Sequence, residues 1–217
     1  MIENREVAGR ELAARLAPLA AERPVVLALP RGGVPVAAPI AAALGVPLEL
    51  LLVRKLGAPG QPELAIGALV DGDPPQMVLN EEIVAAIGAS SAWVLRERER
   101  QLDEMARRRA LLLGDRPPPR LQGRAVVLVD DGVATGATVS AALQAVTAAG
   151  AAHVILAVPV IAADVAARFR ARGVEVVALL EPHELGSVGG FYRDFHQLSD
   201  AEVLRLLSPP AADEGRQ

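Results

Sequence analysis

The residues best suited to chemistry are two adjacent carboxylates, Asp130 and Asp131, which follow an apolar run over 126–129. An ionised carboxylate only accepts hydrogen bonds, so this pair suits two neighbouring sugar hydroxyls or a Mg²⁺ ion held through water. A loop of glycines and threonines comes next and opens a helical pattern, where backbone N–H groups and the helix dipole favour an anion. The residues of this loop are Gly132, Val133, Ala134, Thr135, Gly136, Ala137 and Thr138. Sugar hydroxyls beside a phosphate indicate a site for ribose 5-phosphate.

A second candidate loop, Arg31-Gly32-Gly33, follows the apolar run 25–29. Arginine binds phosphate oxygens bidentately, and the two glycines allow the backbone to turn several N–H groups toward one anion. Taken alone, the same residues also form ordinary turns. Together with the Asp130 loop they predict a second phosphate subsite.

Lys55 is the only lysine of the chain, and it follows the apolar run 48–53. Lysine and arginine differ most where a compact charge is needed, so this lysine is a candidate for stabilising a departing anion. A solvated strand end is the alternative interpretation. The segment 56–63, rich in glycine and proline, is either a connector or a mobile loop beside the site.

The run 126–138 resembles the phosphoribosyl pyrophosphate (PRPP) signature of type I phosphoribosyltransferases, which has four apolar residues, two acids, a short loop and Thr-Gly-x-Thr. The Arg-Gly-Gly loop, the segment 51–69 and Tyr-Arg-Asp-Phe at 192–195 are similar to a branch of uncharacterised predicted phosphoribosyltransferases. This resemblance covers essentially the whole chain and implies Mg²⁺-dependent transfer of ribose 5-phosphate from PRPP to a nitrogen nucleophile, with release of pyrophosphate.

The resemblance also implies a role for each motif. Asp130 and Asp131 would hold the ribose hydroxyls and, through water, the metal, while the loop 132–138 binds the 5-phosphate and Arg31-Gly32-Gly33 the pyrophosphate. Lys55, Asp131 and Arg31 are then the candidate catalytic groups, and the segment 56–63 would close over the reacting centre.

The acceptor is not fixed by these motifs. Ala134 stands where hypoxanthine-guanine members of the resembled family carry an acid, which puts that acceptor class in doubt. Tyr192 and Phe195 are candidates for stacking on a planar acceptor, although anchoring the C-terminal segment to the core is the preferred interpretation. A PRPP-binding regulatory or sensor protein without efficient transfer is the alternative function, and a phosphatase with paired aspartates is a third.

The elements that position these residues follow an alternating order. Apolar runs at 25–29, 48–53, 125–129, 153–158 and 174–180 alternate with helical patterns, which predicts a doubly wound, mainly parallel α/β sheet. A hairpin built from 65–70 and 76–79, on either side of 71–75, interrupts this order. After the hairpin, Asn80 is a candidate cap for a short helix over 81–87 and Ser91 for a long helix to about 113. Near the end of the chain, Ser199 and Glu202 fit a capping box for a last helix through 207. We expect one domain over 1–208, with a small hood from about 56–79 and 183–208, and a disordered tail over 209–217.

Composition narrows the function further. The 217 residues are 52% hydrophobic, carry a net charge of −4 and contain no Cys, which excludes disulfides, thiolate metal sites and a Cys nucleophile. The acidic balance argues against nucleic acid as a partner, and prolines and glycines break the apolar stretch 34–53, so we expect no membrane span. The N-terminus has no secretory pattern, which favours the cytoplasm. The Arg- and Glu-rich pattern over 96–109 predicts a solvated helix face or a subunit contact, so a homodimer stays open.

Overall fold

The computed structural model describes residues 1–207, so the predicted tail over 209–217 lies outside the described residues. Its centre is a five-stranded, all-parallel sheet in the order β2-β1-β6-β7-β8. The strands are β1 (Val25–Ala28), β2 (Leu48–Leu50), β6 (Ala125–Val129), β7 (His153–Val160) and β8 (Glu175–Leu180). This sheet confirms the predicted fold class.

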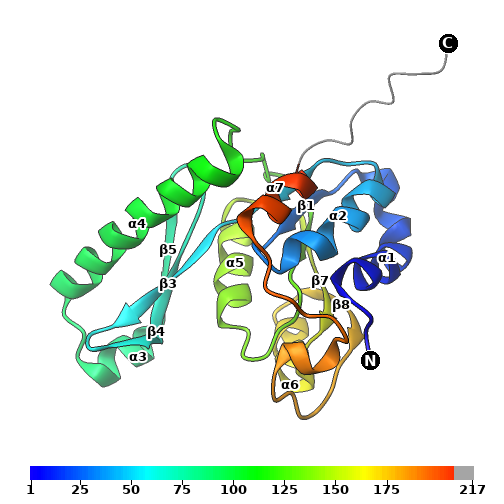
Figure 1. The fold of residues 1–217 in the computed structure, drawn as a ribbon. Coiled ribbons are helices and arrows are strands. Elements are labelled where there is room, and N and C mark those ends of the chain that lie inside the picture. The colour runs from blue at the N-terminus through cyan, green and yellow to red at the C-terminus, as the bar shows by residue number, and fades with distance from the viewer. Residues whose placement is uncertain (208–217) are drawn as a thin grey trace.

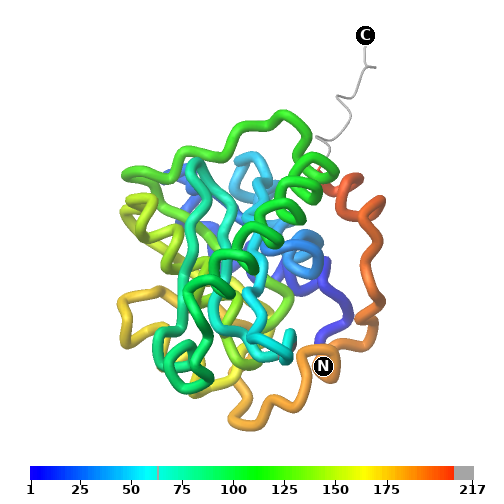
Figure 2. The backbone as a smooth tube through the Cα atoms, turned by 90° about the vertical axis from the view of Figure 1, so that its left-hand side faces the viewer, coloured from blue at the N-terminus to red at the C-terminus, as the bar shows by residue number. Residues whose placement is uncertain are grey.

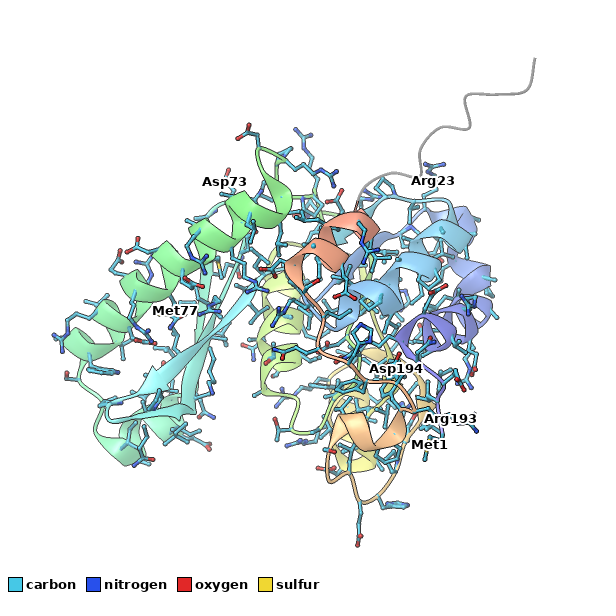
Figure 3. All side chains as sticks on the ribbon, viewed as in Figure 1. Met1, Arg23, Asp73, Met77, Arg193 and Asp194 are labelled. Atoms are coloured by element: carbon cyan, nitrogen blue, oxygen red, sulfur yellow. The ribbon has the colours of Figure 1, made fainter. Side chains whose placement is uncertain are left out.

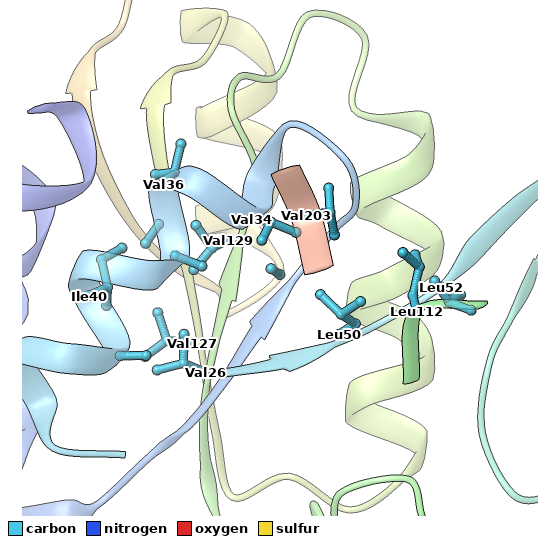
Figure 4. Packing of buried hydrophobic residues seen from close by; sticks show 14 of the residues in the cluster. Val26, Val34, Val36, Ile40, Leu50, Leu52, Leu112, Val127, Val129 and Val203 are labelled. Atoms are coloured by element: carbon cyan, nitrogen blue, oxygen red, sulfur yellow. The ribbon is translucent and has the colours of Figure 1, made fainter. Parts of the chain in front are cut away.

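Helices cover both faces of this sheet (Figure 1). One face carries α1 (Arg5–Leu16) and α2 (Gly33–Leu44), and the other carries α5 (Ala137–Ala148) and α6 (Ala163–Ala171). Successive strand residues point to opposite faces, so Val127 and Val129 pack under α2 while Val126 and Leu128 join the core under α5. Figure 4 shows the first of these cores, where α2 side chains lie against β1 and β6.

A second unit stands between β2 and β6 in the chain. It is the antiparallel sheet β3-β4-β5, built from β3 (Val53–Ala58), β4 (Gln61–Val70) and β5 (Gln76–Leu79), followed by α3 (Glu81–Ile87) and α4 (Ser91–Leu113). The helix α4 crosses the outer face of this sheet, and α5 lies between the small sheet and the main one (Figures 1 and 2).

The expectation of an irregular connecting loop over 56–63 is wrong, whereas closure of this segment over the reacting centre stays a prediction. Residues up to Ala58 continue β3 and residues from Gln61 begin β4, with Ala58 paired to Gln61 across a two-residue turn. Gly60 adopts φ +69° there, a conformation that glycine tolerates best. The predicted hairpin over 65–79 is therefore only part of a three-stranded sheet that begins at Val53.

The helix boundaries follow local capping. The Asn80 side chain accepts a hydrogen bond from the Ile83 N–H and caps α3, as predicted. For α4 the cap is Ser90 and not Ser91, because the Ser90 hydroxyl accepts from the Trp93 N–H. The predicted capping box is confirmed at α7 (Asp200–Leu207), where Ser199 and Glu202 hydrogen-bond reciprocally.

The C-terminal segment returns to the N-terminus. After β8 the chain forms the 3₁₀ turn η2 (Val188–Phe191), and Ile2 then pairs with Tyr192 through a parallel bridge. Figure 3 shows Arg193 and Asp194 beside Met1, where Arg193 also forms an ion pair with Glu3. From there the chain runs over α2 to α7 (Figure 1). No helix within residues 1–207 is both long and apolar enough to cross a membrane.

Candidate functional site

The candidate site lies where the chain direction across the main sheet reverses. From β1 the chain crosses to β2 on one side, and from β6 it crosses to β7 on the other, although β1 and β6 are neighbours. Crevices at the carboxyl ends of strands at such a reversal are the usual ligand sites of open α/β sheets. The loop 29–32 follows β1 and the loop 130–136 follows β6, so both predicted loops meet at this point.

The two loops pack directly against each other. The Leu29 N–H donates to the Val129 carbonyl, which joins the ends of β1 and β6. A Cβ atom at Gly32 would lie 2.0 Å from Oδ2 of Asp131, and one at Gly33 would lie 2.5 Å from the carbonyl of Val129. Glycine is therefore required at both positions by this close approach. The peptide bond between Pro30 and Arg31 is cis.

The loop after β6 leads into the N-terminus of α5. Gly136 has φ +79° and is the N-cap of that helix, so the turn depends on a residue that accepts a left-handed backbone. Thr135, Ala137 and Thr138 lie around this N-terminus, and Thr138 is exposed. Val133 differs from the rest of the loop, because its side chain is buried and its N–H donates to the Val160 carbonyl. Val133 thus ties the loop to β7 and does not line the predicted cradle with its side chain or N–H.

Asp131 is held by an ion pair with Arg5 from the first turn of α1. The Arg5 Nε donates to Asp131 Oδ2 at 2.8 Å, with the two side chains only 9% and 17% exposed. A second guanidinium nitrogen of Arg5 donates to the His196 carbonyl, and the guanidinium carbon lies 3.8 Å from the centroid of the Phe195 ring. One arginine therefore links the acid pair to the C-terminal segment.

Asp130 differs from its neighbour in charge behaviour. Burial, followed by the nearby Asp131 carboxylate, raises the pKa of Asp130 well above its ordinary value. Its Oδ1 accepts the backbone N–H of Asp131 at 2.9 Å. The two adjacent acids consequently differ: Asp131 is paired with a guanidinium, while Asp130 is biased toward its protonated form.

The aromatic residues of the C-terminal segment mainly support the acid pair. The Tyr192 hydroxyl donates to the Asp131 carbonyl at 2.6 Å, and burial followed by the charge of Asp131 raises the pKa of Tyr192. The Tyr192 ring packs on Phe195 with centroids 5.0 Å apart and is only 6% exposed, which leaves it little surface for a ligand. The acceptor contact predicted for Tyr192 therefore lacks geometric support. Phe195 is 36% exposed, and its acceptor role stays a prediction.

Arg31 and Lys55 are not brought together. Alternation along β3 directs Arg54 toward α4 and Lys55 toward α5. Arg54 shares a small cavity with Arg31, whereas Lys55 lines a cavity of about 430 Å³ together with Thr138 from the start of α5. The lysine predicted to assist a departing anion thus lies on the phosphate-loop side of the small sheet.

A family model described as “Phosphoribosyl transferase domain” matches residues 1–179. The chain belongs to this phosphoribosyl transferase family. Relatives from two strains of Mycobacterium tuberculosis, both named “Putative phosphoribosyl transferase”, are 46% identical over 207 residues, which is 95% of this chain and 46% of each relative. The chain therefore spans about half the length of these curated relatives.

A solved structure is similar to this chain over nearly its whole length. The crystal structure of TT1426 from Thermus thermophilus is similar with 44% sequence identity and a TM-score of 0.79, over 95% of this chain and 97% of that chain. Because the similarity covers nearly all of both chains, it includes the small sheet and α4 as well as the main sheet.

Arg5 is a residue of this candidate site that the sequence patterns do not reveal. It lies 126 positions from Asp131, in a helix whose local pattern marks it only as a charged residue of the first turn. Arg54 and Arg108, which line one cavity with Arg31, were also not among the site residues predicted from the sequence. Neither the spacing nor the type of these arginines distinguishes them from the other arginines of the chain.

Proposed function

We propose that this protein transfers ribose 5-phosphate from PRPP to a nitrogen nucleophile, a base or a related small molecule, and releases pyrophosphate. The observation that carries the proposal is the packing of Gly32 against the Asp131 carboxylate at the chain reversal. A phosphate loop, paired acids and an Arg-Gly-Gly loop are thereby held together at the carboxyl edge of the main sheet. These are the groups that a phosphate-sugar-diphosphate ligand requires.

In this proposal the residues position charge and contribute no covalent nucleophile. The residues at the start of α5 bind the 5-phosphate, because backbone N–H groups and the helix dipole favour an anion there. Asp130 and Asp131 accept the ribose hydroxyls, and Arg31 with the Gly32-Gly33 backbone binds the diphosphate. Asp131 is oriented by its ion pair with Arg5, so its acceptor role depends on that contact.

Magnesium fits this site only if it is shared with the substrate. No group of three or more His, Cys, Asp or Glu that could hold a metal ion occurs within residues 1–207. Mg²⁺ commonly binds through one or two carboxylates, several waters and substrate phosphates, and the pair Asp130–Asp131 suits that arrangement. When bound, the ion would neutralise charge on the diphosphate.

The first test is calorimetric titration of PRPP with and without Mg²⁺. Wild-type protein is compared with Asp130→Asn/Asp131→Asn and with Asp71→Asn as a matched control, since Asp71 also pairs with an arginine, Arg109, but lies outside the crevice. We expect metal-dependent binding that the double variant loses and the control keeps. An absence of PRPP binding to the wild type would refute the proposal.

Turnover separates the transferase from the alternative of a PRPP sensor. Pyrophosphate release is measured across a panel of bases and amines after binding has been established. Release above background with one acceptor supports transfer and names the acceptor class, whereas binding without release across the panel supports the sensor. The single domain over 1–208, the hood, the cytoplasmic location and a homodimer remain predictions.

A further inference from the structure

Three arginines from separate elements gather beside the Arg-Gly-Gly loop. They surround a cavity of about 220 Å³. Arg31 belongs to the Arg-Gly-Gly loop itself, Arg54 comes from β3, and Arg108 from the long helix α4. The cavity is lined by Pro30, Arg31, Leu52, Val53, Arg54, Met105 and Arg108. A cluster of three guanidinium groups at one end of the crevice suits an anion of high charge.

Polar contacts on α4 orient part of this cluster. The Arg54 Nε donates to Oε1 of Gln101 at 3.0 Å, and the amide of Gln101 donates to the carboxylate of Glu97. Glu97 and Gln101 are both buried, so this chain of hydrogen bonds fixes β3 against α4. These contacts hold the Arg54 side chain in place. They also fix the position of α4, which contributes Arg108 to the same cavity.

A carboxylate of the protein already approaches two of these arginines. Asp200, the first residue of α7, places Oδ1 at 3.4 Å from Arg108 and 3.9 Å from Arg31. Glu104 lies nearby but is engaged by Arg107, which is the main cause of its lowered pKa, with smaller contributions from Arg54 and Arg108. The cluster therefore carries excess positive charge and holds a carboxylate at its opening.

The cavity is placed at the diphosphate end of the proposed ligand. It lies on the β2 side of the loop 29–32, and the phosphate loop lies on the β6 side. Neighbouring strands are about 4.8 Å apart, and β6 and β2 are separated only by β1. The sheet edge from β6 to β2 is therefore about 10 Å long. A ligand with a phosphate in the β6 loop would extend its other end toward the arginines.

We propose that Arg108 of α4 is a binding residue for the diphosphate group of the substrate, and that Asp200 is a competing carboxylate which leaves the cluster when the diphosphate binds. This inference rests on the proposed function. A diphosphate has more charge and more acceptor oxygens than one carboxylate, so it replaces Asp200 at Arg31 and Arg108. The start of α7 would thereby respond to the occupancy of the site.

The test measures the binding of inorganic pyrophosphate and of PRPP, each with Mg²⁺, to wild type, Arg108→Gln, Asp200→Asn and Arg98→Gln. Arg98 is the matched control, because it also lies on α4 and pairs with a glutamate, Glu99, but does not line the cavity. Arg107 is unsuitable, since its loss would free Glu104 beside the cluster. Ribose 5-phosphate, which lacks the diphosphate group, is the control ligand. Thermal unfolding of each variant verifies that it is folded.

We expect Arg108→Gln to weaken binding of both diphosphate ligands about tenfold or more, because a charge-assisted hydrogen bond is lost. Asp200→Asn should tighten the same binding about two- to fivefold, the range set by a weak and partly exposed ion pair. Ribose 5-phosphate binding should not change in either variant, and Arg98→Gln should resemble the wild type.

The outcomes separate this inference from the proposed function. If the wild type binds PRPP but Arg108→Gln behaves like Arg98→Gln, the inference is overturned and the proposed function stands. Weaker binding in Asp200→Asn would overturn the competing role of the carboxylate. A wild type that binds pyrophosphate with the expected variant effects but fails to bind PRPP would overturn the proposed function alone. Binding of neither ligand would overturn both.

Discussion

Gly32→Ala tests the contact that joins the two loops. Gly32 has φ −62° and ψ −36°, a conformation open to alanine, so the backbone itself does not oppose the substitution. At such a position a change from glycine to alanine ordinarily stabilises a protein by about 0.4–1 kcal/mol. Here the new Cβ would lie 2.0, 2.3 and 2.8 Å from the three carboxyl atoms of Asp131. The clash should therefore reverse the sign of the effect.

The expected loss has two sources. Overpacking of this kind costs about 1–3 kcal/mol, and displacing Asp131 weakens a charge-assisted hydrogen bond from Arg5 worth about 1.5–3 kcal/mol. Because the carboxylate can move partly rather than leave completely, we expect Gly32→Ala to lower the free energy of unfolding by about 2–4 kcal/mol. PRPP binding should weaken as well. The control is Gly186→Ala, where no atom lies within 4 Å of the new Cβ and φ is not positive, with an expected change within about 0.5 kcal/mol.

A double-mutant cycle measured by urea denaturation identifies the cause. All three nearest atoms belong to the Asp131 carboxyl group, so Asp131→Ala removes them. In that background Gly32→Ala should lose most of its effect, giving a coupling free energy of at least about 1 kcal/mol. An equal cost of Gly32→Ala with and without the carboxylate would refute the steric reasoning, as would a stability equal to that of Gly186→Ala.

Three further predictions concern the acid pair and the C-terminal segment. The raised pKa of Asp130 means that its contribution to stability is intact below the ordinary value of 3.8 and is lost as pH rises through the folded-state pKa. Asp130→Asn should therefore gain stability relative to wild type from about pH 4 toward 8 in urea denaturation, and a flat difference would contradict this. The pKa of His196 is raised above 6.5, first by Asp194, so an NMR titration should show it lowered by Asp194→Asn; an unchanged titration would disprove that pairing. Tyr192→Phe removes the hydrogen bond to the Asp131 carbonyl and should cost about 0.5–1.5 kcal/mol on urea denaturation, with no loss arguing against the bond.

The predictions from sequence succeeded where the deciding interactions are local. The run 126–138 indicates a buried strand, a glycine turn and a helix start, and each depends on residues within a few positions. The Asn80 cap and the Ser199–Glu202 capping box are local in the same way. The family resemblance rests on these continuous motifs, which is why the family and the α/β fold were both predicted correctly.

The extent of β3 and β4 was not predictable from local pattern. Glycine and proline between positions 57 and 62 are typical of a loop, and the strands are established by pairing with each other and by packing against α4 and α5. Propensity is a weak guide when such neighbours decide the conformation. The assignment of Ser91 as a helix cap failed for a smaller reason, since two adjacent serines offer the same hydroxyl and only backbone geometry selects Ser90.

The sequence by itself determined the chemistry at the ends of β1 and β6: two acids, a phosphate loop and an Arg-Gly-Gly loop. The tertiary structure alone decided which charged side chains from distant parts of the sequence lie beside these groups. It places Arg5 on Asp131, turns Arg54 toward Arg31 and Lys55 away from it, and brings Arg108 and Asp200 to the same cluster. The physical reason is that an ion pair between residues many positions apart depends on the packing of whole helices and strands, and no local spacing encodes that packing.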